Sequence, residues 1–424
     1  MSRTTTARRR LLATAAALAV LVGACSSGGD DASTGGDANP GGATEAVATD
    51  YSAFGPYEVG RTTLDLDGVE VTVLYPVTTE GAAQGTAVTS ISSAVAFPEA
   101  FREVVVEAAP FLVQELPVDL YDDAPVADDG PFPVLLYSHG AGGHPSFYIN
   151  TMAHSASWGY VVAAPDHPSR NLAAGVGAVP DELTSTDTED LVATVEALNA
   201  ANADSGDLLY EAVDTAQLAA AGHSAGGGAS ARLALEGEVA GSRLATIIGQ
   251  APSPPVSLSA VIGDADATEE ERNATLAAAL GELTPPDLPV LLVAGERDAV
   301  IPLGRIQATY DWLGTPKQLV VLANAGHNPV LDVCAPIREQ GGLVALAGGL
   351  ADAFGPGVAG LLARGEDGCV EGYLDPQAGF DVTRHLTVAQ LRWVFGTDPT
   401  RASLEPAFLT ATFGDAIGPV EQDI

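Results

Sequence analysis

The sequence predicts an α/β protein built around a mostly parallel, doubly wound sheet with inserted helical segments. Short, fully apolar runs rich in β-forming residues recur along the chain, and stretches with helical character separate them. Such runs are typical of strands that are buried on both faces, as in a parallel sheet. Because strands and helices alternate, we expect helices on both faces of that sheet.

The expected strands begin with a hairpin and continue with separate apolar runs. The hairpin strands, 57–66 and 69–75, are joined near Asp67-Gly68, a dipeptide that favours a tight turn. The apolar runs lie at 133–138, 160–164, 218–222, 244–249, 289–294 and 318–322. The expected helices lie at about 149–158, 187–202, 225–236, 303–313 and 385–395.

Three segments interrupt this alternation, and we interpret them as insertions around one domain that spans 51–424. The segments are about 77–130, 251–287 and 328–380. The first carries apolar residues at helical spacing over 97–116. The second contains a helix that the capping box Thr268-x-x-Glu271 would open. The third contains two further apolar helices.

Residues 1–24 are predicted to be a signal peptide. Three arginines at 8–10 precede a mostly apolar run over 11–22, which is too short to span a bilayer. The tetrapeptide Val22-Gly23-Ala24-Cys25 resembles the bacterial lipobox, which implies cleavage before Cys25 and lipid on its sulfur. An ordinary secretory signal followed by an incidental cysteine is the alternative.

Residues 25–50 are rich in Gly, Ser and Asp and contain almost no large apolar side chain. They are expected to be a flexible tether. Together with a lipidated Cys25, they predict an exported domain that is anchored to the extracytoplasmic face of the cell membrane. Export could use the general or the twin-arginine route.

The charge balance excludes nucleic acid as a partner. The chain has 55 acidic residues against 18 Lys and Arg, a formal net charge of −37. Such a chain repels phosphate backbones. Lys317 is its single lysine, which argues against Schiff-base chemistry and against a lysine-bearing phosphate loop.

The cysteines point to a disulfide and not to a metal site. Cys25, Cys334 and Cys369 lack metal-ligand spacing, and the chain has neither a CxxC nor an HExxH motif, so we expect no metal and no cofactor. Cys334 and Cys369 are predicted to pair, because they are the two cysteines outside the leader and export favours oxidation.

The segment Gly222-His223-Ser224-Ala225-Gly226 follows an apolar strand and opens an alanine-rich helix. A strand-to-helix turn of this kind exposes a serine nucleophile in a strained backbone conformation, with small neighbours that allow tight packing. The helix N-terminus then directs the Ala225 N–H toward the oxygen of an attacked carbonyl. A glycine-rich helix start with an incidental serine is the alternative.

An acid and a base follow Ser224 along the chain, each after a predicted strand. Asp298 follows the strand at 289–294, and His327 follows the strand at 318–322. His327 would accept the Ser224 proton, and Asp298 would orient the imidazole and stabilise its cation. Glu296 is a rival acid, as is a carboxylate after the preceding strand.

A glycine-rich loop over 139–143 follows the strand at 133–138. Its glycines allow backbone amides to face a ligand, so the Ala141 N–H is the second expected oxyanion donor, with Gly142 in reserve. A merely tight turn is the alternative. His139 and His223 flank these motifs and are expected to orient loops and not to act as the base.

Several motifs taken together resemble those of known α/β-hydrolases. These are FPVLLYSHGAGG (132–143), WGYVVAAPDHPS (158–169), GHSAGGGAS (222–230), LLVAGERDAVIP (291–302) and AGHNPVLDVC (325–334). The chain resembles the group around platelet-activating-factor acetylhydrolase, dienelactone hydrolase and the cutinase-like polyesterases. The resemblance implies carboxylic ester hydrolysis through Ser224, Asp298 and His327, with oxyanion donors at Ala141 and Ala225.

Two positions depart from that group. The polyesterases carry a bulky aromatic residue where this chain has Ala141, and a tryptophan where it has Gln250-Ala251-Pro252. The dienelactone hydrolases use a cysteine where it has Ser224. Hydrolysis of polyesters or dienelactones is therefore not part of the expectation.

The sequence thus predicts a lipid-anchored serine esterase or lipase that acts on small-molecule or lipid esters with apolar acyl groups. An acyltransferase and a non-catalytic binding lipoprotein on the same scaffold are the alternatives. Apolar faces in 97–116 and 341–363 are expected to form a cap over the acyl pocket. Helices that merely extend the core are the alternative to a cap.

Overall fold

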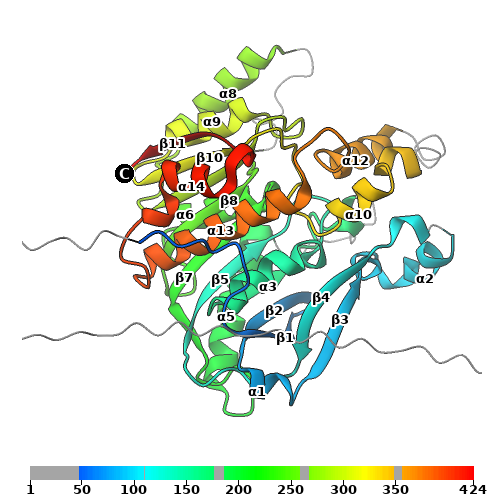
Figure 1. The fold of residues 1–424 in the computed structure, drawn as a ribbon, viewed down its shortest axis with the longest axis vertical. Helices are drawn as coiled ribbons and strands as arrows, with labels where there is room; N and C mark the ends of the chain where they lie inside the picture. The colour runs from blue at the N-terminus through cyan, green and yellow to red at the C-terminus, as the bar shows by residue number, and fades with distance from the viewer. Residues whose placement is uncertain (1–46, 109, 176–185, 258–266, 348–355) are drawn as a thin grey trace, which may run out of the picture. The chain divides into compact units, whose positions relative to one another are not determined.

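The computed structural model describes residues 47–424 except 109, 176–185, 258–266 and 348–355 (Figure 1). The predicted signal peptide, Cys25 and nearly all of the expected tether lie outside the described residues. No helix among the described residues has the length and apolar character needed to cross a bilayer.

A single 11-stranded sheet has the order β11-β10-β9-β8-β7-β5-β6-β2-β1-β4-β3. Neighbouring strands from β10 to β6 in this order run parallel. β2 pairs antiparallel with β6 and with β1, and β11 pairs antiparallel with β10. The strands are β1 (Glu58–Leu66), β2 (Val69–Val77), β3 (Thr86–Ser92), β4 (Glu115–Asp122), β5 (Phe132–Ser138), β6 (Val161–Pro165), β7 (Val213–His223), β8 (Leu244–Gln250), β9 (Val290–Gly295), β10 (Lys317–Leu322) and β11 (Ile417–Asp423).

Helices cover both faces of this sheet, so the doubly wound α/β prediction is confirmed. α3 (Ile149–Ser157) and α13 (Pro376–Val394) pack on one face, and α5 (Asp187–Ala203), α6 (Ala225–Leu235) and α9 (Leu303–Trp312) pack on the other (Figure 1). Successive residues of β5 divide between two cores. Leu135 packs with the α3 and α13 side, and Leu136 packs with the α5 and α6 side. Alternation along a strand buried on both faces produces this division.

Each predicted apolar run forms a strand, and the hairpin pairs with Leu66 opposite Val69. The sheet also contains β3, β4 and β11, which the sequence pattern did not predict. In β4 the residues from Glu115 to Leu120 alternate between exposed and buried, which is the period of a strand with one solvent face. Residues 77–130 therefore extend the sheet as well as contributing a helix.

Two helix predictions had wrong bounds. A helix over 97–116 is not formed, since α2 spans Glu99–Ala108 and a 3₁₀ turn at Pro110–Leu112 leads into β4. Proline lacks the N–H that a continuing helix requires. The helix expected at 385–395 begins at Pro376 instead, where Asp375 accepts a hydrogen bond from the Gln377 N–H and caps it.

The remaining helical elements lie in the insertions and loops. The capping box predicted for α8 is present, with Thr268 Oγ1 accepting from the Glu271 N–H at 3.3 Å. The helical elements of the described insertions and loops are α1 (Thr79–Ala82), η1 (Ser93–Ala96), η3 (Pro145–Tyr148), α4 (Leu172–Gly175), α8 (Glu269–Gly281), α10 (Cys334–Glu339), α12 (Pro356–Glu366), η4 (Ala402–Leu404), α14 (Pro406–Phe413) and η5 (Gly414–Ala416).

A disulfide joins Cys334 and Cys369, as predicted. It connects the start of α10 to the turn after α12 and closes a loop with a sequence separation of 35. In the chain-entropy model a loop of this length contributes about 3–4 kcal/mol to the free energy of unfolding.

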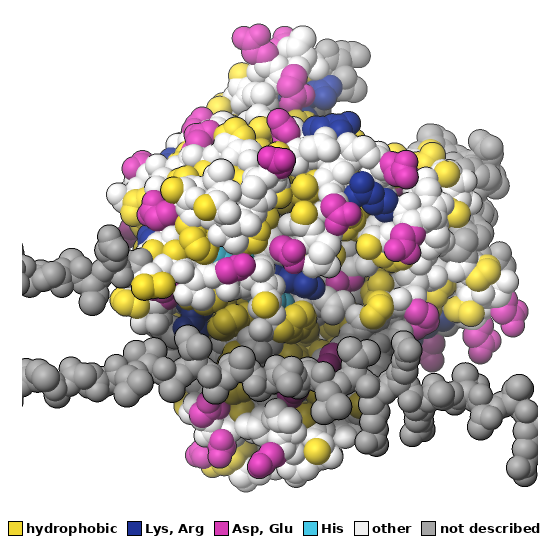
Figure 2. Space-filling view, viewed as in Figure 1, with side chains coloured by type: hydrophobic (Ala, Val, Ile, Leu, Met, Phe, Trp, Pro, Cys, Tyr) yellow, Lys and Arg dark blue, Asp and Glu magenta, His cyan; other side chains and the backbone are white. Residues whose placement is uncertain are grey.

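The acidic side chains are distributed singly over the face drawn in Figure 2, among neutral and apolar neighbours, and basic side chains are few. An acidic excess spread in this way makes a solvated, repulsive surface rather than a binding patch on that face.

Candidate active site

Ser224 occupies the turn between β7 and α6 with φ 54° and ψ −121°. A left-handed backbone is strained for a residue with a side chain, and it persists only where the surroundings hold it. The Ser224 N–H donates to Gln250 O at 2.9 Å, and Ser224 O accepts from the Ser253 N–H at 2.8 Å. At Gly226 a Cβ would collide with the carbonyl of Ser138, so a residue without a side chain is required there.

Asp298 lies in the turn after β9, and its side chain is fully buried. Its Oδ1 accepts from the N–H groups of Val300 and Ile301 at 2.8 and 2.7 Å. Its Oδ2 lies 2.8 Å from Nδ1 of His327, which follows β10. Because a carboxylate accepts, Nδ1 carries the proton and the lone pair of neutral His327 is on Nε2. That tautomer is the one a general base needs.

The structure places one rival acid, Glu296, away from the imidazole of His327. Glu296 is exposed, and its Oε2 accepts from the Asn324 N–H at 2.8 Å. The first carboxylates after β8, at 264 and 266, lie outside the described residues. Among the described residues, Asp298 is the carboxylate that contacts the imidazole ring of His327.

Ser224 and His327 line the same cavity, which has a volume of about 300 Å³. Its wall is largely apolar. Phe97 and Leu112 come from the first insertion, and Leu343, Leu361 and Leu362 come from the third. A pocket with apolar walls and a few convergent polar groups is the usual form of a small-molecule site.

Five of the residues in the two segments expected to form a cap thus line the cavity, whereas others in those segments are not part of its wall. Val105 is half-buried and does not line the cavity, and Val344 is exposed. Leu350 and Phe354 lie outside the described residues, as do the side chains of Phe101, Ala108 and Val358.

The two expected oxyanion donors lie in different elements. Ala141 lines the cavity, and Ala225 is the first residue of α6. The reserve donor Gly142 is not available, because its N–H donates to Arg170 O at 2.7 Å. Gly142 adopts φ +73°, a conformation that suits glycine.

His223 links the oxyanion loop to the base. Burial holds the pKa of His223 well below its ordinary value, so its ring is neutral. Nε2 lies 2.9 Å from His327 O and donates to that carbonyl, which leaves Nδ1 to accept from the Tyr148 O–H at 2.9 Å. The Tyr148 oxygen in turn accepts from the Gly140 N–H at 3.1 Å. Sequence reasoning missed Tyr148, which no local motif marks.

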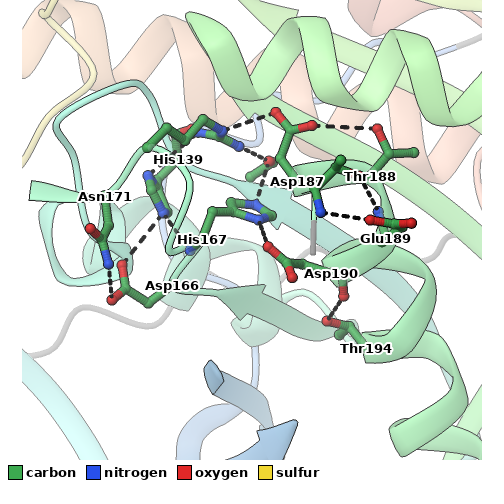
Figure 3. A network of polar contacts seen from close by, with 12 residues as sticks. His139, Asp166, His167, Asn171, Asp187, Thr188, Glu189, Asp190 and Thr194 are labelled. Atoms are coloured by element: carbon green, nitrogen blue, oxygen red, sulfur yellow. Dashed lines mark hydrogen bonds and ion pairs between the residues drawn. The ribbon is translucent and has the colours of Figure 1, made fainter. Parts of the chain in front are cut away.

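His139 and His167 belong to a buried polar network beneath the oxyanion loop (Figure 3). His139 Nε2 accepts from the His167 N–H at 3.0 Å, so His139 orients the backbone and does not reach the cavity as a base. The Arg170 guanidinium donates to His139 O and to Ser138 Oγ, and it pairs with Asp187 at 3.1 Å. The network anchors the loop that carries Ala141.

Among the described residues, no group of three or more His, Cys, Asp or Glu side chains is arranged to hold a metal ion. The residues at the site offer a serine hydroxyl, an imidazole, a carboxylate and backbone N–H groups.

A family model described as Chlorophyllase matches residues 106–260. The matched part includes β4 to β8, the oxyanion loop and Ser224, and it does not include Asp298 or His327. No curated protein matches the chain. The match supports the α/β-hydrolase fold and the cleavage of carboxylic esters. The finer likeness to the acetylhydrolase, dienelactone hydrolase and polyesterase group remains a resemblance in sequence motifs.

Proposed function

We propose that this carboxylic ester hydrolase is a serine esterase that cleaves esters of apolar acyl groups through Ser224, His327 and Asp298. The observation that carries the proposal is the 2.8 Å contact of His327 Nδ1 with Asp298 Oδ2, because a proton on Nδ1 that donates to the carboxylate puts the lone pair on Nε2, in a histidine that lines the same cavity as Ser224. The strained backbone of Ser224 at a helix N-terminus supports it.

In this mechanism His327 Nε2 accepts the proton of Ser224 Oγ while that oxygen bonds to the ester carbonyl carbon. The carbonyl oxygen becomes an oxyanion, and the N–H groups of Ala141 and Ala225 would stabilise it. When the C–O bond to the alcohol breaks, His327 returns the proton to the leaving oxygen. Water then attacks the acyl-enzyme by the same steps and releases the acid and Ser224.

The apolar walls of the cavity support a hydrocarbon acyl chain as the bound group. Each methylene that becomes buried contributes up to about 0.8 kcal/mol to binding. We therefore expect kcat/KM to increase from acetyl to butyryl or hexanoyl esters and to decrease for chains that the cap cannot hold.

A series of nitrophenyl esters of increasing acyl length tests this directly. Both products, the carboxylic acid and the nitrophenol, are measured. Activity that is highest for acetate and falls with each added carbon would contradict an apolar acyl site. Acyl groups that appear on an added alcohol in preference to water would favour acyl transfer. A wild-type chain that binds the esters and cleaves none would favour a binding protein.

We also propose that the enzyme is exported and anchored through lipid on Cys25. The lipobox-like tetrapeptide supports this, as does the Cys334–Cys369 disulfide, because structural disulfides are typical of oxidising compartments. Partition of Cys25→Ala and wild-type protein between membrane and soluble fractions tests the proposal. A Cys25→Ala protein that remains wholly in the membrane fraction would refute the anchor.

A further inference from the structure

One carboxylate oxygen of Asp367 contacts the backbone of two loops, the one that carries Asp298 and the one that carries His327. It follows α12, and only 8% of its surface is exposed. Its Oδ2 accepts from the His327 N–H at 3.0 Å and from the Ala299 N–H at 3.0 Å. Ala299 directly follows Asp298, so a single oxygen holds the peptide groups of the base and of the acid loop.

The hydrogen bonds of the acid loop divide between two carboxylates. Asp298 Oδ1 accepts from Val300 and Ile301, whereas the N–H of the intervening residue, Ala299, donates to Asp367. Asp298 therefore satisfies only part of its own loop. The rest depends on a residue that lies 40 positions beyond His327.

The chain around Asp367 is pressed against the His327 loop. The Asn328 N–H donates to Asp367 O at 2.9 Å, and the Asn328 side chain donates to Arg364 O at 2.6 Å. A Cβ on Gly326 would come within 2.5 Å of Gly368, so the two glycine backbones are in direct contact. Packing this close leaves the Asp367 carboxylate little freedom to move.

A covalent link holds the same segment in place. Cys369 is bonded to Cys334, which begins α10 shortly after the His327 loop. The disulfide thus joins two parts of the third insertion near the His327 loop. Neither cysteine lines the cavity.

We propose that Asp367 is a positioning residue that sets the geometry of the Asp298–His327 pair, and that the Cys334–Cys369 disulfide keeps it in position. The proposal deepens the proposed function and rests on it, because it concerns the same triad. Asp367 acts through backbone N–H groups and does not line the cavity. Its effect should therefore fall on kcat and not on substrate binding.

The first test compares Asp367→Ala and Asp367→Asn with wild type on nitrophenyl butyrate. We expect kcat to fall about 100-fold in Asp367→Ala with KM within about threefold, because a small misplacement of catalytic groups has an effect of that order. Asp367→Asn keeps an acceptor oxygen and should lose roughly tenfold or less. The matched control is Glu366→Gln, since Glu366 Oε2 accepts from the Val344 N–H at 2.7 Å, outside the triad. Its kcat should stay within about twofold of wild type.

A second readout keeps the proposal testable if Asp367→Ala does not fold. In Asp367→Asn any loss should appear in kcat with KM within about threefold of wild type, because the carboxylate contacts backbone N–H groups of the triad loops and does not line the cavity. A merely structural role that loosens the third insertion would change KM as well.

A double-mutant cycle tests the role of the disulfide. Replacing both cysteines by serine should lower kcat in the wild-type background and should lower it little further in an Asp367→Asn background, because the two changes act through one group. Equal losses in both backgrounds would show that the disulfide does not act through Asp367.

The proposed esterase function and the positioning role of Asp367 can be refuted independently. A wild-type protein that a fluorophosphonate does not label at Ser224 would overturn the proposed function. A labelled, active wild type beside a folded Asp367→Ala with wild-type kcat, or a folded Asp367→Asn with wild-type kcat where Asp367→Ala does not fold, would overturn the role of Asp367 alone. A loss in Glu366→Gln equal to that in Asp367→Ala would do the same.

Discussion

Two histidines of this molecule contact a buried aspartate through Nδ1 at the same distance. His327 contacts Asp298 at 2.8 Å, and His167 contacts Asp190 at 2.8 Å. The second histidine also lies 2.9 Å from a serine, Ser138 Oγ, through its Nε2. The hydrogen bonds among Ser138, His167 and Asp190 are those of a catalytic triad.

The surroundings of the two serines differ. Ser224 lines a cavity, has a strained backbone and precedes the first turn of α6. Ser138 ends a strand, is fully buried and accepts a hydrogen bond from Arg170 at 2.6 Å. No carbonyl carbon can approach it. A serine–histidine–aspartate arrangement is therefore not sufficient for catalysis, which also needs access and an oxyanion site.

The largest expected effect separates the two serines. Ser224→Ala should lower kcat by a factor on the order of 10⁴ or more and leave the fold unchanged, because the nucleophile itself is lost. Ser138→Ala should keep kcat within about tenfold and lower the free energy of unfolding by about 1–3 kcal/mol, since Arg170 and His167 lose a buried partner. Ester kinetics and urea denaturation measure the two. Loss of turnover in the Ser138 variant alone would reverse the assignment.

The two histidines should differ in the same way. His327→Ala should lose turnover to a degree similar to Ser224→Ala, because the general base is removed. His167→Ala should lower the free energy of unfolding by about 1–3 kcal/mol, since Asp190 and Ser138 each lose a buried hydrogen bond to the ring. Circular dichroism and ester kinetics on both variants provide the check. Activity of His327→Ala within about tenfold of wild type would move the base elsewhere.

The buried histidines also predict acid sensitivity of the fold. Burial lowers the pKa of His144 and of His154 to about 4, and it lowers the pKa of the ring of His167 well below its ordinary value. Between about pH 6.5 and 4 the unfolded chain binds protons at these rings that the native state does not bind. The free energy of unfolding should therefore fall as the pH decreases through that window, by up to about 3 kcal/mol for a ring shifted to about 4.

Two aspartates oppose this trend. Burial raises the pKa of Asp166 to about 6 and the pKa of Asp332 to about 7, so their contribution to stability grows as the pH falls. Because burial lowers the pKa of six histidines, the histidines should dominate. Thermal denaturation between pH 7 and 4.5 measures the balance, and a Tm that rises toward low pH would show that the aspartates dominate instead.

The smallest expected effect concerns the apolar wall of the cavity. Leu361→Ala should lower kcat/KM for a hexanoyl ester by about tenfold and for an acetyl ester by much less, because only the longer chain contacts the removed carbons. Val344→Ala is the matched control, since Val344 belongs to the same insertion and is 42% exposed. Equal losses on both esters would place Leu361 outside the acyl site.

The local sequence predicts the strands that position the triad residues compared above. Mostly apolar runs predicted the parallel strands from β5 to β10, because a strand buried on both faces has few polar positions. Ser224, Asp298 and His327 each follow such a run, so their meeting at one edge of the sheet could be anticipated. The edge strand β11 was missed because its sequence, IGPVEQD, has a proline and three polar residues and is mostly exposed.

The groups that hold the triad in place could not be anticipated in the same way. Asp367 reaches His327 across 40 residues, and Tyr148 reaches His223 across 75. Neither residue belongs to a motif, and their roles depend on tertiary packing that no local pattern encodes. The same is true of His167, whose contact with Ser138 imitates a triad only once the chain is folded.

A fluorophosphonate label mapped by peptide mass spectrometry tests the central claim most directly, because the reagent needs both an accessible serine and a base that activates it. The account predicts one adduct, on the peptide that contains Ser224, which disappears in Ser224→Ala and in His327→Ala and persists in Ser138→Ala. An adduct on Ser138, or labelling at Ser224 that does not depend on His327, would contradict it.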